Sequence, residues 1–136
     1  MSGLRPLVWA GAVLALAACD GDVERACPAI GWSNLVTVEL AGPWPDGGGR
    51  SVRLGCSTPC GPSLPSEAPS AATAPVRGSV ARVVLGMVTP DTVDVTVLGP
   101  DGAVLAGTTA DLAWVRVGGS PDCGGPHEAA VTVPAP

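Results

Sequence analysis

The sequence predicts an all-β domain of about seven short strands. Three observations favour this class. Runs rich in valine and threonine alternate apolar with polar residues, glycine and proline separate these runs, and no stretch after residue 18 has the i, i+3, i+4 spacing of an amphipathic helix. Seven such strands in about 100 residues are typical of a β-sandwich.

The first two strands are expected at residues 34–40 (NLVTVEL) and 51–56 (SVRLGC), each with alternate apolar residues on one face. If the two strands pair antiparallel with these faces inward, one register sets Leu40 opposite Val52. The same register sets Glu39 opposite Arg53 on the solvent side. Apolar pattern and charge therefore predict the same pairing.

Residues 57–75 (STPCGPSLPSEAPSAATAP) hold five prolines and no strand pattern, which predicts a long loop. GPDG at residues 99–102 is a strong tight-turn signal. Five further strands are expected at residues 79–88, 92–98, 103–106, 111–117 and 129–133. Together these elements predict an immunoglobulin-like (Greek-key) antiparallel β-sandwich, with a transthyretin-like or other Greek-key sandwich as the alternative.

The N-terminus has the charge order of a secretory signal peptide, with Arg5 before an apolar run and acidic residues after it. The run, residues 7–18, extends roughly 18 Å as a helix, well short of the ~30 Å hydrocarbon layer of a bilayer. It ends in Leu16-Ala17-Ala18-Cys19, which resembles the lipobox of bacterial lipoproteins. This resemblance implies that diacylglycerol alkylates the Cys19 thiol, that the preceding bond is cut, and that the protein stays lipid-anchored on the extracytoplasmic face of the cell membrane. An ordinary secretory signal with a chance cysteine is the alternative.

The expected organisation is a signal peptide at 1–18, a lipidated tether and lead-in at 19–33, and a β-sandwich domain at 34–136 that contains the loop at 57–75. Cleavage leaves 118 residues with 6 arginines against 12 acids, a formal charge of −6. This charge argues against binding nucleic acid. The expected partners are the membrane, through lipid on Cys19, and cell-wall polymer or another envelope protein.

The four cysteines other than Cys19 form an even set in an exported chain, which predicts two disulfides. In an up-and-down antiparallel domain, all four fall at the same end. We therefore expect Cys27 to pair with Cys123 and Cys56 with Cys60, although the other two connectivities remain open.

The expected function is a non-enzymatic binding or scaffolding domain without cofactor. The alternative is a metal-binding or thiol-redox lipoprotein that uses Cys56, Cys60, Cys123 and His127. Metal binding is disfavoured because structural zinc sites use paired C-x2-C motifs, and redox chemistry because no helix is predicted to lower a thiol pKa.

A hydrolytic site would have to recruit Ser120, Asp122, His127 and Glu128 from one glycine-rich loop, whereas real triads draw on separate elements. The candidate ligand-binding residue is Trp44, which two prolines flank in the first long loop. An aromatic side chain held by prolines loses little entropy on binding. The alternative is that Trp44 folds back over its own sheet.

Overall fold

The computed structural model describes residues 26–45, 47–63 and 68–136, and these ranges confirm an all-β fold with two disulfides. Eight strands form one mixed sheet in the order β6-β5-β2-β3-β4-β1-β8-β7. Their bounds are β1 Asn34–Ala41, β2 Ser51–Gly55, β3 Ala71–Arg77, β4 Val80–Leu85, β5 Thr92–Leu98, β6 Val104–Asp111, β7 Val115–Arg116 and β8 His127–Pro134. No described residue belongs to a helix of the length and apolarity needed to cross a membrane.

The sheet encloses a single core. Strands on both sides of the β3–β4 junction bury alternate residues, so that β1 buries Val36 and Val38 while β5 buries Val93 and Val95. These side chains belong to one buried cluster together with residues of β2, β4 and β8. Because each of these strands buries only one face, the sheet must curve until its two halves share that face.

The predicted pairing of the first two strands is wrong. β1 pairs antiparallel with β4 and parallel with β8, so Glu39 has Val80 and Thr132 as its Cα partners. β2 pairs with β3 and β5, which places Arg53 beside Thr73 and Thr96. The parallel β1–β8 pair also contradicts an up-and-down topology. β1 and β2 lie in different halves of the sheet, so the connection between them leads from one half to the other instead of closing a hairpin.

The predicted strand set also needs correction. The loop expected at 57–75 ends early because β3 begins at Ala71, and the strands expected at 103–106 and 111–117 are instead Val104–Asp111 and Val115–Arg116. β3 contains Pro75, which has no N–H for a central ladder. The strand tolerates this proline because Pro75 lies where β3 leaves β2 and turns to pair with β4 from Val76 onward.

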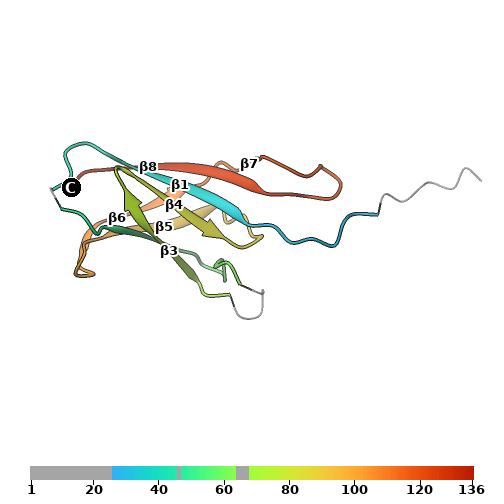
Figure 1. Cartoon of the computed structure of the whole chain (residues 1–136), viewed down its shortest axis with the longest axis horizontal. Coiled ribbons are helices and arrows are strands. Elements are labelled where there is room, and N and C mark those ends of the chain that lie inside the picture. Colours follow the sequence, from blue (N-terminus) through green and yellow to red (C-terminus); the bar gives the residue numbers. More distant parts are fainter. Residues whose placement is uncertain (1–25, 46, 64–67) are drawn as a thin grey trace, which may run out of the picture.

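Different segments of the chain form the two ends of the domain. The lead-in, residues 26–33, and the β7–β8 connection lie together at one end, and the C-terminus lies at the other (Figure 1). The C-terminal end also holds the 42–50 loop, since the Ala135 amide donates to the Ala41 carbonyl over 2.8 Å. We call the end that holds residues 26–33 the lead-in end. Both β1 and β8 begin there and run toward the other end.

Candidate functional site

The lead-in is cross-linked to the β7–β8 connection by the Cys27–Cys123 disulfide, whose Cα atoms are 5.3 Å apart across 96 residues of sequence. The connection is a narrow loop closed by a bridge between Ser120 and Gly124. In this loop the Cys123 amide donates to the Ser120 hydroxyl over 3.1 Å. Gly119 has a φ of +69° and would place a Cβ against the Gly124 carbonyl, so only glycine lets the two arms of the loop come this close.

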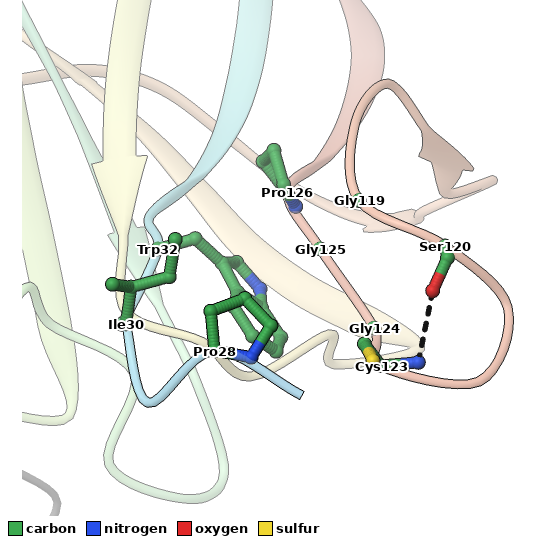
Figure 2. Close-up of a pocket in the computed structure, with 10 residues that line it drawn as sticks. Pro28, Ile30, Trp32, Gly119, Ser120, Cys123, Gly124, Gly125 and Pro126 are labelled. Carbon is green, nitrogen blue, oxygen red and sulfur yellow. Dashed lines mark hydrogen bonds between the residues drawn. The ribbon is translucent and has the colours of Figure 1, made fainter. Parts of the chain in front are cut away.

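Trp32 of the lead-in packs on this loop. Its ring lies close to Gly124, and Figure 2 shows Trp32, Pro28 and the arm that carries Gly124 and Gly125 around one pocket. These residues line a cavity of about 270 Å³ with Ile30 and Cys123 among its walls. The indole Nε1 is buried and makes no hydrogen bond within the described part of the chain. The cavity thus has mostly apolar walls, and the unpartnered indole nitrogen is buried away from solvent.

Gly124 allows this contact, because a Cβ there would lie 2.9 Å from Cη2 of Trp32. We expect Gly124→Ala to lower the free energy of unfolding by about 1 to 2 kcal/mol through its φ of +75°, and by about 1 kcal/mol or more through displacement of the indole. Gly102→Ala is the matched control, since its φ is +80° but nothing lies within 4 Å. Thermal unfolding followed by tryptophan emission separates the two effects, and equal losses in both variants would contradict the packing of Trp32 on Gly124.

A buried asparagine fixes the base of this site. Asn34 is fully buried at the start of β1, and its Nδ2 donates to the Val88 carbonyl over 2.8 Å. Its Oδ1 accepts the backbone amide of His127 over 2.8 Å, so one side chain ties β1 to the start of β8 and to the segment after β4. Asn34 was not predicted as a site residue, although its parity with Val36 and Val38 places it on the inward face.

The Cys56–Cys60 disulfide closes a short turn at the same end. Cys60 is buried, its amide donates to the Pro69 carbonyl over 3.0 Å, and its carbonyl accepts the Gly86 amide over 2.8 Å. Two further hollows, of about 190 and 410 Å³, lie around this turn and share Gly86 and Met87. The larger one also shares Gly31 and Trp32 with the cavity of Figure 2, so the three hollows form one continuous surface, which we call the lead-in surface.

The three cysteines of the alternative metal or redox site have no free thiol. The sulfurs of Cys56, Cys60 and Cys123 are all in disulfides, in the connectivity expected from the sequence. His127 starts β8 with its Nδ1 buried and without a hydrogen-bond partner. Within residues 26–45, 47–63 and 68–136, no three His, Cys, Asp or Glu side chains gather as a metal site would require.

The hydrolytic candidates are spread between a loop and a strand. Ser120 lies in the loop with its oxygen accepting a backbone amide, and Asp122 is exposed beside it. Glu128 is exposed on β8, where its Cα partners are Leu35 and Val115. This placement gives Ser120 a role in shaping the loop that carries Cys123.

Trp44 is half-buried at the opposite end and packs against the core cluster. The Arg50 guanidinium carbon lies 6.0 Å from the centre of its ring, and Arg50 Nη1 donates to the Pro45 carbonyl over 2.7 Å. These contacts match the alternative in which Trp44 folds over its own sheet. Its role as a ligand-binding residue stays a prediction.

The lipidation site expected at Cys19 lies outside the described residues, as does the signal peptide at 1–18. Comparison of the chain with protein-family models, with curated proteins and with solved structures returned no match. The function is therefore argued from this chain's own residues.

Proposed function

We propose that this chain is an exported cell-envelope protein, anchored by lipid on Cys19, with a non-enzymatic binding or scaffolding domain. The observation that carries the proposal is the Cys27–Cys123 bond. It joins the chain to the folded domain only eight residues after Cys19, at the end where the lead-in enters. An anchor at Cys19 would therefore hold the domain by its cross-linked end. Two disulfides are typical of an oxidising compartment outside the cytoplasm.

We also propose that the sheet belongs to the Greek-key sandwiches of the immunoglobulin-like kind. The strand order supports this class. β2, β3 and β4 are neighbours in chain order, and β1 lies beside β4 instead of beside β2, which is the order of a Greek key. The two halves of the sheet are joined by only two residue pairs, Val76 with Ala81 and Arg77 with Val80. Such a short junction lets two layers face each other across one core.

The proposed partners are cell-wall polymer or another envelope protein, met by the end that faces away from the anchor. The 42–50 loop lies at that end in Figure 1 and exposes Pro43 and Pro45 on either side of Trp44. Loops that prolines hold in one conformation lose little conformational entropy on binding.

Cell fractionation tests the anchor. We expect the wild-type chain in the membrane fraction and Cys19→Ala in the soluble or secreted fraction, because two or three acyl chains hold a protein stably on a bilayer. The control is the pair Cys56→Ala with Cys60→Ala, which removes two other cysteines and keeps Cys19. This control is expected to remain with the membrane. A Cys19→Ala chain that stays membrane-bound would refute the lipid anchor.

A further inference from the structure

The three hollows of the lead-in surface differ in charge from two other hollows of the described residues. None of the described residues that line its three hollows is Asp, Glu, Arg or His. The hollow between β3 and β4 instead includes Arg77 and Arg82, and the one over β1, β7 and β8 includes Glu128. Because these described lining residues carry no charge, they can meet an apolar phase without the large cost of desolvating an ionised group.

Large apolar side chains stand out from this surface. Ile30 is 69% exposed, Met87 51% and Val88 40%. They are neighbours, because a Cβ at Gly31 would lie 3.7 Å from the sulfur of Met87. Ile30 and Trp32 both border the cavity, and Figure 2 shows both side chains at its wall. Tryptophan is enriched at membrane–water interfaces.

We propose that the lead-in surface rests on the lipid bilayer, with Ile30, Met87 and Val88 in the boundary between headgroups and acyl chains. This inference rests on the proposed lipid anchor at Cys19. Ala26, where the described chain begins, is seven residues from Cys19, and seven extended residues span at most about 25 Å. The anchor therefore keeps this surface close to the bilayer at all times.

The opposite end of the domain lies away from this surface. The C-terminus and the 42–50 loop lie at the far end of the strands in Figure 1. Contact through the lead-in surface therefore stands the sheet on the membrane and directs the Trp44 loop toward the cell wall. The bilayer acts as a second attachment that fixes orientation, beyond the tethering that acyl chains supply.

Fluorescence quenching tests this contact in the lipidated protein on phosphatidylcholine vesicles. Bromine atoms on the acyl chains quench tryptophans that lie at the headgroup–acyl boundary. We expect brominated vesicles to reduce the emission of the wild-type protein. Ile30→Asp should abolish this loss, because it places a carboxylate in the contact. Val104→Asp is the matched control, since Val104 is 68% exposed on the edge strand β6, and it should be quenched as the wild type is.

The outcomes separate the two proposals. A protein that sediments with the vesicles but shows no quenching, or equal quenching in Ile30→Asp, would overturn the bilayer contact and leave the anchor intact. Loss of quenching in Val104→Asp as well would also overturn it, because the effect would then follow from any added charge. A protein that carries no lipid and does not sediment would overturn the anchor and this inference together.

Discussion

Replacing Cys27 and Cys123 together by alanine is expected to lower the free energy of unfolding by about 4 to 5 kcal/mol. The bond joins residues 96 apart in sequence, so its removal returns a large loop-closure entropy to the unfolded chain. A small domain has only about 5 to 15 kcal/mol in total, and the double variant should be close to unfolding at 37 °C. Urea unfolding of the oxidised proteins measures the difference.

The second disulfide provides the control for this prediction. Cys56 and Cys60 are only four residues apart, and the same entropy estimate gives about 2 kcal/mol for a loop of that size. Truncation of the buried Cys60 side chain adds about 1 kcal/mol of lost packing. The long-range bond should therefore remain the more stabilising of the two. A larger loss in Cys56→Ala/Cys60→Ala would contradict this assignment.

Asn34→Leu is expected to lower the free energy of unfolding by about 3 to 4 kcal/mol, because each orphaned buried group costs roughly 1 to 3 kcal/mol. Leucine keeps the branched shape and the number of side-chain heavy atoms but leaves the His127 amide and the Val88 carbonyl without their partners. Hydrogen exchange at the His127 amide should accelerate in parallel. Ser33→Ala, one residue earlier at an exposed position, is expected to change stability by less than about 0.5 kcal/mol. Equal stability of the two variants would show that Asn34 does not hold the lead-in end together.

Strand positions could be predicted wherever alternating apolar residues are large. β1 and β5 bury valines at every second position, and both were placed within a residue of their bounds. β3 was missed because its buried residues are Ala72 and Ala74, whose small side chains give a weak apolar signal beside Pro75. Small residues and a proline in a strand are explained only by its neighbours.

Strand partners could not be predicted from the same pattern. The inward valines of β1 fit any strand with an apolar face, and an exposed pair such as Glu39 with Arg53 is worth less than about 1 kcal/mol. That is too little to choose a partner. The parallel pairing of β1 with β8, which sets Val38 beside Val131, joins segments about 90 residues apart and has no local signal.

The candidate site was predictable in part. All four paired cysteines were predicted at one end, and the structure has them there, although the up-and-down topology on which this prediction rested is wrong. The packing of Trp32 on Gly124 depends on a disulfide and on two glycines with positive φ. These features fix a three-dimensional contact that spacing along the chain does not encode.

Mass spectrometry of the intact protein from native membranes, taken without reductant and after thiol alkylation, is the most direct test of the central claim. We expect a chain that begins at Cys19, carries a diacylglyceryl adduct on it, and takes up no alkylating reagent at Cys27, Cys56, Cys60 or Cys123. A chain that retains residues 1–18, begins without lipid, or is alkylated at any of these four cysteines would contradict an anchored, disulfide-bonded envelope domain.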